Sequence, residues 1–376
     1  MAQTYDLILK GGTVVNHDGE GMRDIGIRGG RFAAIGDLAL ASAGDVVDCR
    51  GLHLLPGVID SHVHFREPGL THKEDLETGS LSAVMGGVTA VFEMPNTDPL
   101  TVTAQAVADK VKRGHHRMHC DFAFYVGATR ENTKDLAELE RLPGVAAVKV
   151  FMGSSTGSLL VEDDEGVRAI LKVISRRAAF HSEDEYRLRE RMNLRVEGDP
   201  RSHPVWRDAT AALMATKRLI ALAHETGKRV HVLHVTSMEE AVFLADHKDV
   251  ASAEATPAHL TLAAPDCYER LGTLAQLNPP IREAPTATLY GLAWRKASST
   301  ASARIIRRIP AQRKRSSIRS RIPACPECRR WFPSCSTTSM PAGCRCFALS
   351  ISPAPARPGC MGLPPRAASR KATTPM

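Results

Sequence analysis

The chain has 376 residues, of which 43% are hydrophobic, and a formal net charge of +8. This length suits one large domain or two ordinary ones, and the hydrophobic fraction is sufficient for a real core. A membrane span is excluded, because no run of about 18 apolar residues occurs.

The net charge conceals a division of the chain. Residues 284–376 contain 17 Lys and Arg but one acid, Glu327, whereas residues 1–283 contain 32 Lys and Arg against 40 Asp and Glu. The first part therefore carries −8 and the second +16. Six of the nine cysteines lie beyond residue 283, and all 15 histidines lie before it. Two sequences of different character are joined near this point.

The amino terminus, MAQTYDLILKGG, has no apolar stretch of the length that a signal peptide needs. The cysteines of the acidic part (Cys49, Cys120 and Cys267) are scattered and form no disulfide framework. We therefore expect a cytoplasmic protein.

Residues 1–56 are predicted to form a β-rich amino-terminal segment. Short strand patterns separated by glycine turns occur in YDLILKGGTVV, DIGIRGGRFAAIG and VVDCRGLHLLPG. From residue 57 the pattern changes to apolar strands that alternate with helical stretches. The strand candidates are GVIDSHVHF, GVTAVFEMP, CDFAFYVGA, AAVKVFMG, RRAAFHSED, RVHVLHVTS and VASAEATPA.

Residues 57–283 are predicted to form a parallel α/β domain. The helix pattern is clearest in residues 208–228, where Gly227 is a natural C-cap. Its apolar face is predicted to comprise Ala209, Ala212, Leu213, Thr216, Leu219, Ile220 and Ala223. Strands that alternate with helices favour a parallel sheet, and a (β/α)8 barrel would need eight strands. Seven are found, so one strand is missing.

Polar side chains lie where several of these strands end. His62 and His64 are two residues apart, so on a strand both point the same way, as two ligands of one metal would. Lys149 lies in an apolar strand, and His181 and His234 end two further strands. Because a barrel carries its chemistry at the carboxyl ends of its strands, these residues predict a metal-dependent site.

Other histidines are assigned no metal-binding role. His115, His116 and His119 are expected to be solvated, and His259 to serve packing or hydrogen bonding. His231 alternates out of phase with its apolar strand face and is a candidate to support a ligand. The remaining histidines belong to no predicted cluster of site residues: His17, His53, His72, His203, His224 and His247.

Seven segments, in order, resemble dihydroorotase of the amidohydrolase superfamily. They are LLPGVIDSHVHFREPG, MPNT, KVFMGSSTG, FHSEDE, HVLHVTS, EATPAHL and LNPPIR, within a match from about residue 5 to residue 282. Hydantoinases and allantoinases are similar in the metal motifs, but FREPG and NPP fit dihydroorotase better. The resemblance implies a (β/α)8 TIM barrel of the metal-dependent hydrolase type, with a small β-sandwich domain built from the chain ends.

The resemblance also implies the site residues. His62 and His64 would bind one Zn²⁺ ion and His181 and His234 a second, with N6-carboxylated Lys149 bridging the two ions. Carboxylation replaces a costly buried ammonium with an anionic oxygen ligand. Arg66, whose planar fork suits two oxygens, and Asn96 would hold the substrate carboxylate, and Asn278 would contact the dihydropyrimidine ring.

The family also needs an aspartate at the end of strand eight, within a D-H-x-P-H motif, as metal ligand and proton-transferring base. Residues 284–376 contain no aspartate and no histidine, so no catalytic residue is retained and strand eight is predicted to be lost. A shifted reading frame accounts for this: the codons of ARIIRRIP (residues 303–310) can then encode T-D-H-P-P-H-T. We therefore interpret residues 284–376 as a frameshift product, mostly disordered.

Several alternatives remain open. A basic arm that binds nucleic acid would explain the charge of the tail, but the shifted frame explains its composition better, so no nucleic-acid partner is expected. CPEC, residues 325–328, resembles half a zinc ribbon without a second pair. The expected enzyme is a homo-oligomer acting on dihydroorotate and carbamoyl-aspartate. The functional alternatives are an allantoinase or hydantoinase, and a non-catalytic partner of aspartate transcarbamoylase.

Overall fold

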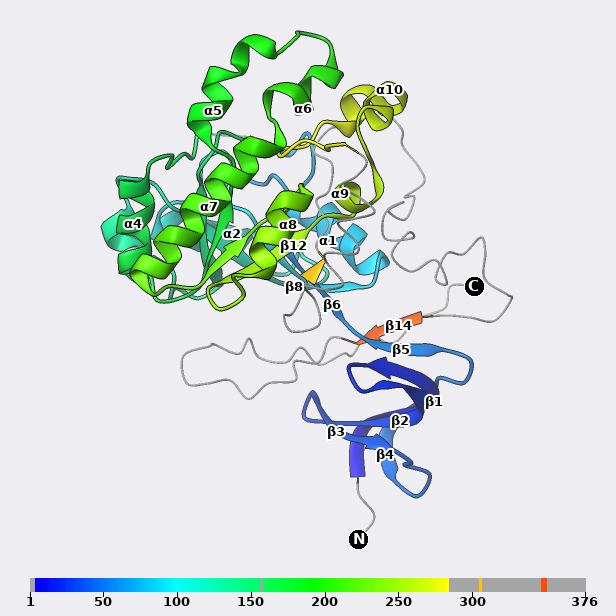
Figure 1. The fold of residues 1–376 in the computed structure, drawn as a ribbon. Helices are drawn as coiled ribbons and strands as arrows, with labels where there is room; N and C mark the ends of the chain where they lie inside the picture. The colour runs from blue at the N-terminus through cyan, green and yellow to red at the C-terminus, as the bar shows by residue number, and fades with distance from the viewer. Residues whose placement is uncertain (1–3, 156–157, 284–303, 306–345, 350–376) are drawn as a thin grey trace. The chain divides into compact units, whose positions relative to one another are not determined.

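The computed structural model describes residues 4–155, 158–283, 304–305 and 346–349 (Figure 1). The described strands and helices form two compact units, which divide between Val58 and Ile59. The predicted frameshift product, residues 284–376, lies outside the described residues except for two short strands. Among the described helices, none is long and apolar enough to span a membrane.

The first unit is a six-stranded sheet in the order β14-β5-β1-β2-β3, with β4 paired to β1. Its strands are β1 (Thr4–Asn16), β2 (Gly19–Arg28), β3 (Arg31–Gly36), β4 (Ser42–Asp48), β5 (His53–Pro56) and β14 (Cys346–Leu349). Strand β1 has a register irregularity between Leu9 and Gly12, where Gly11 has φ +72°. Residues before this point pair with β4 and residues after it with β5, so one strand serves two pairings. The strands predicted within residues 5–55 are confirmed.

The second unit is built on a sheet whose strands follow one another in chain order from β6 to β13. The strands are β6 (Val58–Val63), β7 (Val88–Glu93), β8 (Asp121–Gly127), β9 (Val145–Phe151), β10 (Ala178–His181), β11 (Val230–Val232), β12 (Ala251–Ala255) and β13 (Arg304–Ile305). From β7 to β13 neighbouring strands pair in parallel. All seven strands predicted within residues 57–283 are confirmed, as is the α/β barrel-type fold class.

Helices join these strands. They are α1 (Leu76–Met85), α2 (Ala104–Gly114), α3 (Leu136–Leu139), α4 (Asp164–Val173), α5 (Glu185–Glu190), α6 (His203–Trp206), α7 (Ala209–Thr226), α8 (Met238–Ala245), α9 (Pro257–Thr261) and α10 (Asp266–Leu271). Helix α7 contacts β11, and α8 contacts β12 (Figure 1). Buried Val, Leu, Ile and Ala side chains of strands β8 to β12 and of helices α2, α4, α7 and α8 form the main core.

Helix starts follow the capping preferences of short polar side chains. In α1, α2, α4, α5, α7, α8 and α9 the residue before the helix accepts a hydrogen bond from the third backbone N–H that follows it: these caps are Asp75, Thr103, Asp163, Asp184, Asp208, Ser237 and Thr256. Helix α7 ends at Gly227, with φ +65°, as predicted. Five of the seven residues predicted to face the core from α7 are buried, whereas Ala209 and Leu213 are half-buried.

The eighth position of the sheet is occupied by β13, a strand of two residues. Arg304 pairs with Glu254 and Ile305 with Ala255, in parallel with β12. This pairing of two residues falls short of the eighth strand that a (β/α)8 barrel needs, so the predicted loss of that strand stands. The residues there are arginine and isoleucine, so the strand does not restore the missing aspartate.

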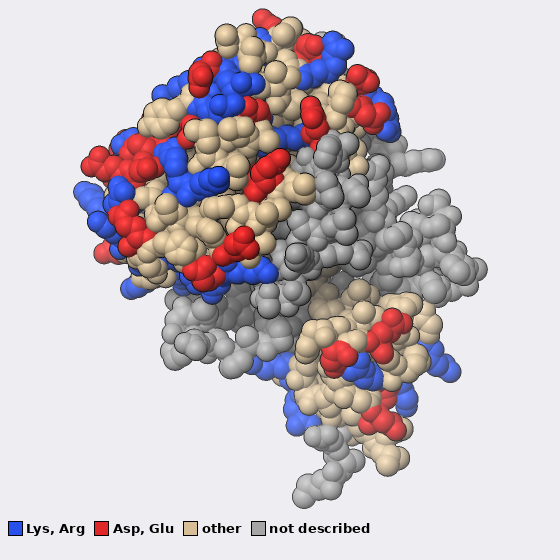
Figure 2. Space-filling view, in the orientation of Figure 1, with Lys and Arg blue, Asp and Glu red and all other residues tan. Residues whose placement is uncertain are grey.

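Charged side chains of both signs are interspersed over the face seen in Figure 2. Arg168 of α4 pairs with Glu225 of α7 at 2.6 Å, and Arg218 of α7 pairs with Asp164 of α4 at 2.7 Å. Exposed charges of opposite sign are thus paired between α4 and α7.

Candidate metal centre

Four predicted ligands lie at or just beyond the carboxyl ends of their strands. His62 lies near the end of β6 and His64 one residue past it, His181 is the last residue of β10, and His234 follows β11 by two residues. All four side chains are buried. β10 and β11 are parallel neighbours. β6 is at the far end of the strand order, and yet the rings of His62 and His234 lie close together, as in a sheet that curls like a barrel.

His62 and His64 form one pair, with Nε2 atoms 3.2 Å apart. The other ring nitrogen of His62, Nδ1, lies 2.5 Å from Oε1 of Glu254 on β12. The second oxygen of Glu254 lies 2.9 Å from Nε2 of His231. Burial alone would raise the pKa of Glu254, but the two histidines lower it to about 2. The carboxylate thus orients His62 so that its Nε2 faces His64.

His181 and His234 form the other pair, with Nδ1 of His181 3.1 Å from Nε2 of His234. Nε2 of His181 lies 2.9 Å from Oε2 of Glu183. The two pairs adjoin, because the ring centroids of His62 and His234 are 5.2 Å apart. Burial, only partly offset by Glu183, lowers the pKa of His181 to about 3. At neutral pH His181 is therefore an uncharged imidazole, the form that binds metals.

Lys149 lies on β9 in register with Ala179 of β10, two residues before His181. Its side chain is buried, and Nζ is 4.0 Å from the ring centroid of Phe151. The charge of Lys149 contributes to the lowered pKa of His181. The structure therefore places this buried lysine beside the second histidine pair.

The histidine pairs fit a divalent metal. Two imidazole nitrogens that bind one Zn²⁺ tetrahedrally, at about 2.0–2.1 Å each, lie about 3.3 Å apart. The observed separations of 3.2 Å and 3.1 Å are close to this value. Within the described part of the chain, no group of three or more His, Cys, Asp or Glu side chains has metal-binding geometry. Tetrahedral zinc has four ligands, so each histidine pair could supply two of them.

Arg66 follows the first histidine pair and is buried with φ +67°. None of its three guanidinium nitrogens has a hydrogen-bond acceptor within the described residues. Burial lowers the pKa of Arg66, opposed by the negative charge of Glu93. A buried guanidinium without acceptors is costly, and an anionic ligand would remove that cost. Asn96, the other predicted carboxylate ligand, is also buried and lies three residues after Glu93 in the chain.

The loop that carries Arg66 depends on Gly69. This glycine has φ +85°, and a Cβ at its position would lie 2.0 Å from the carbonyl oxygen of Asp98. The same contact region includes a hydrogen bond from Asp98 N to Pro68 O, at 3.1 Å. The glycine therefore allows this loop to lie against the segment that follows Asn96.

A matched pair of substitutions tests this contact. Gly198 has a similar φ of +79° but open space around the Cβ position, so Gly198→Ala is expected to cost about 1–2 kcal/mol of unfolding free energy. Gly69→Ala should cost about 1–3 kcal/mol more, because the neighbouring backbone must also move. Urea unfolding of the two variants measures the difference, and equal losses would contradict the account.

Asn278, predicted to contact the substrate ring, follows the 3₁₀ helix Gly272–Ala275. Its side chain hydrogen-bonds His203 of α6, whose pKa burial lowers to about 4. The sequence places His203 in no predicted cluster of site residues. The described contacts thus connect Asn278 to α6.

Four residues of the centre were not identified from the sequence: Glu183, Glu254, Arg207 and Arg282. Glu183 follows His181 by two residues, which in extended chain puts both on the same side. Glu254 lies near the end of the seventh predicted strand. These positions are the sequence features from which the two carboxylates could have been identified. Arg207 lies between α6 and α7. Arg282 lies at the end of the part of the chain that resembles dihydroorotase.

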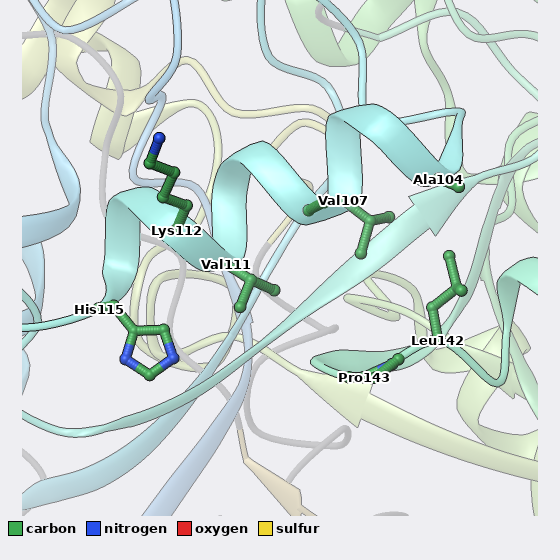
Figure 3. A pocket seen from close by; sticks show the side chains of 8 residues that line it. Ala104, Val107, Val111, Lys112, His115, Leu142 and Pro143 are labelled. Carbon is green, nitrogen blue, oxygen red and sulfur yellow. The ribbon is translucent and has the colours of Figure 1, made fainter.

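An apolar hollow of about 380 Å³ lies elsewhere, beside helix α2 (Figure 3). It is lined by Ala104, Val107, Ala108, Val111, Lys112, His115, Leu142 and Pro143. None of these is a predicted site residue, so the hollow is separate from the candidate centre.

Comparisons with known proteins agree with this arrangement. The model of the dihydro-orotase-like family matches residues 51–147, which include the first histidine pair, Arg66 and Asn96. The dihydroorotase of Halobacterium salinarum is 36% identical over 273 residues, covering 70% of this chain and 61% of that protein. The dihydroorotase of Methanosarcina mazei is 34% identical over 273 residues, covering 69% and 59%.

Other cyclic amidohydrolases are similar too. The allantoinase of Deinococcus radiodurans is 32% identical over 291 residues, covering 74% of this chain and 64% of that protein. The solved L-hydantoinase (dihydropyrimidinase) of Arthrobacter aurescens superposes with a TM-score of 0.71 at 26% identity, covering 76% and 66%. The chain thus spans less than two thirds of the length of these curated relatives.

In its fold, its histidines at strand ends and these matches, the chain is similar to the cyclic amidohydrolases. Among these proteins, the family model and two of the relatives above are dihydroorotase-like, so the resemblance extends to that group.

Proposed function

We propose that this chain is a zinc-dependent dihydroorotase, which reversibly hydrolyses (S)-dihydroorotate to N-carbamoyl-L-aspartate in de novo pyrimidine biosynthesis. The observation that carries the proposal is the buried guanidinium of Arg66, which has no acceptor among the described residues, on the loop that follows His62 and His64. Dihydroorotate bears a carboxylate that this group would bind. The ring amide would then lie toward the histidine pairs.

The residues have separate tasks in this proposal. His62 and His64 would hold one divalent ion and His181 and His234 the other, with carboxylated Lys149 as a shared oxygen ligand. When bound, such ions polarise the amide carbonyl and lower the pKa of a water molecule. Arg66 and Asn96 would orient the substrate by its carboxylate, and Asn278 would contact the ring. Glu254 and Glu183 would keep His62 and His181 in their ligand orientations.

We further propose that activity is impaired because residues 284–376 are translated out of frame. The position of β13 supports this reading. Arg304 and Ile305, whose codons can encode aspartate in the shifted frame, pair with the end of β12, where the eighth strand of the barrel belongs. The restored aspartate would thus fall at a strand end beside the histidines.

Substrate choice tests the proposal against the allantoinase and hydantoinase alternative, which the Deinococcus relative and the Arthrobacter structure support. The chain with its frame restored after Arg282 should hydrolyse dihydroorotate faster than allantoin or hydantoin. Arg66→Met should raise the KM for dihydroorotate on the order of ten- to a hundred-fold, the value of a charge-assisted hydrogen-bonding pair. The same substitution should leave the KM for allantoin and for hydantoin, which carry no carboxylate, unchanged. Faster hydrolysis of allantoin or hydantoin would favour the alternative.

A non-catalytic partner of aspartate transcarbamoylase is the alternative from another class. Co-purification of the zinc-free chain with that enzyme would support it. The cytoplasmic location and a homo-oligomeric state stay predictions.

A further inference from the structure

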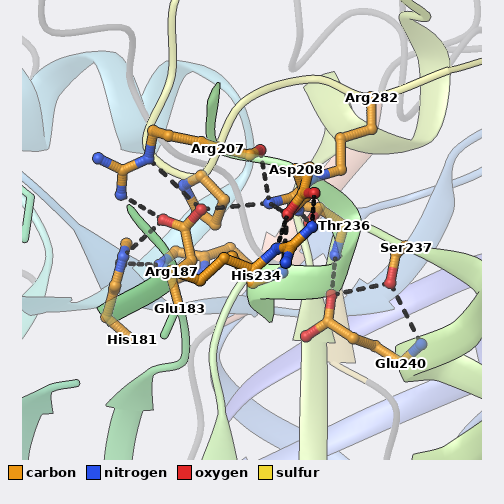
Figure 4. Close-up of polar contacts among 12 residues, drawn as sticks. His181, Glu183, Arg187, Arg207, Asp208, His234, Thr236, Ser237, Glu240 and Arg282 are labelled. Carbon is orange, nitrogen blue, oxygen red and sulfur yellow. Dashed lines mark hydrogen bonds and ion pairs between the residues drawn. The ribbon is translucent and has the colours of Figure 1, made fainter. Parts of the chain in front are cut away.

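The two histidine pairs rest on carboxylates in different surroundings. Glu254, behind His62, has a second contact with His231. Glu183, behind His181, is held by two arginines, Arg207 and Arg282 (Figure 4). Among the described residues, two arginines thus support the second half of the centre, whereas His231 supports the first.

The carboxylate of Glu183 is completely buried and receives donors on both oxygens. Oε2 contacts Nε2 of His181, at 2.9 Å, and the guanidinium of Arg207. Oε1 lies 3.2 Å from NH2 of Arg282 and 3.4 Å from Nε of Arg207. Arg207 and Arg282 bring two positive charges against this carboxylate. Both oxygens of this buried carboxylate therefore have partners.

Arg282 connects the two loops that carry the second histidine pair. Its guanidinium donates to Oγ1 of Thr236, two residues after His234, and to Glu183, two residues after His181. It also donates to the backbone oxygens of Arg207 and Asp208, at 3.1 Å and 2.9 Å. Side-chain exposure is 5% for Arg282 and 3% for Arg207. A single planar group therefore fixes Glu183, the loop after β11 and the start of α7.

We infer that Arg207 and Arg282 are positioning residues, which hold Glu183 so that His181 keeps its proton on Nε2 and presents Nδ1 toward His234. The function that we assign to this arrangement depends on the proposed metal centre, but the contacts that form it are present without metal. It assigns opposite tautomers to the two supported histidines. His62 has its proton on Nδ1, facing Glu254, and His181 has its proton on Nε2, facing Glu183.

Nitrogen-15 spectra of histidine-labelled, metal-free 376-residue protein test this assignment. The unmodified protein should show His181 as the Nε2–H tautomer and His62 as the Nδ1–H tautomer. In Arg282→Gln and Arg207→Gln, His181 should lose its single tautomer while His62 keeps its own. Co²⁺ titration should show affinity at the second pair reduced at least about tenfold, the low end of the effect of removing a ligand's hydrogen-bonding support.

The matched control is Arg168→Gln, which removes an arginine from a surface ion pair with Glu225 and should change neither readout. If a glutamine variant fails to fold, Arg207→Lys keeps the charge but loses the fork, and should show partial loss of the His181 tautomer. Folded variants with an unchanged His181 tautomer and unchanged Co²⁺ affinity would overturn the inference, as would the Nδ1–H tautomer in the unmodified protein. Failure of the frame-restored chain to hydrolyse dihydroorotate would count against the proposed function alone, because the tautomers are measured without metal or substrate.

Discussion

Restoring the reading frame after Arg282 is expected to raise the rate of dihydroorotate hydrolysis at least about 10²- to 10⁴-fold over that of the 376-residue chain. This is the usual contribution of a positioned general acid–base group, and the present chain has no aspartate after residue 283 to supply one. The two proteins should be compared with zinc present, by the loss of dihydroorotate absorbance.

Two controls make that comparison specific. His62→Asn in the frame-restored chain should abolish the gain, which assigns the activity to this centre. Sequencing the gene across codons 275–310 should reveal a base missing or extra relative to the present reading. Rapid zinc-dependent turnover by the 376-residue protein itself would contradict the account.

The second large effect concerns metal binding. His62→Asn is expected to weaken binding of one Zn²⁺ ion at least about 100-fold, because loss of a ligand should exceed the 10- to 100-fold cost of losing a ligand's supporting contact. Lys149→Met should also weaken binding, since it removes the oxygen ligand proposed to be shared. Competition with a chromophoric chelator measures both affinities.

The matched control for the lysine variant is Lys172→Met, a change in the exposed last turn of α4. It should leave zinc affinity unchanged. Retention of full zinc affinity by Lys149→Met would show that this lysine is not a ligand.

The strands of the second unit were predictable because apolar runs of the right length end in polar residues and alternate with capped helices. Helix α7 shows where such patterns lose precision. Ala211, Ala215 and Leu222 are buried beyond the predicted stripe, because α7 contacts α4, α5 and α8 as well as β11. A helix with neighbours on several sides buries more than a single face.

The four histidines could be located from the sequence because each lies at or close to the carboxyl end of an apolar strand. Glu183 could not be identified in this way, because an acid within SEDE resembles a run of solvated charges. The arginines that stabilise Glu183 in the interior come close to it only in the folded chain. Arg282 contacts residues 46 and 99 positions away, Thr236 and Glu183. No local spacing encodes such contacts, so the positioning arginines become visible only when the loops are assembled.

The most direct test of the metal centre is a crystal of this protein grown with zinc and measured at the zinc absorption edge. The account predicts one anomalous peak between His62 and His64 and a second between His181 and His234, with extra density on Nζ of Lys149 between them. Zinc bound to the protein at other residues, with no peak at either histidine pair, would contradict it.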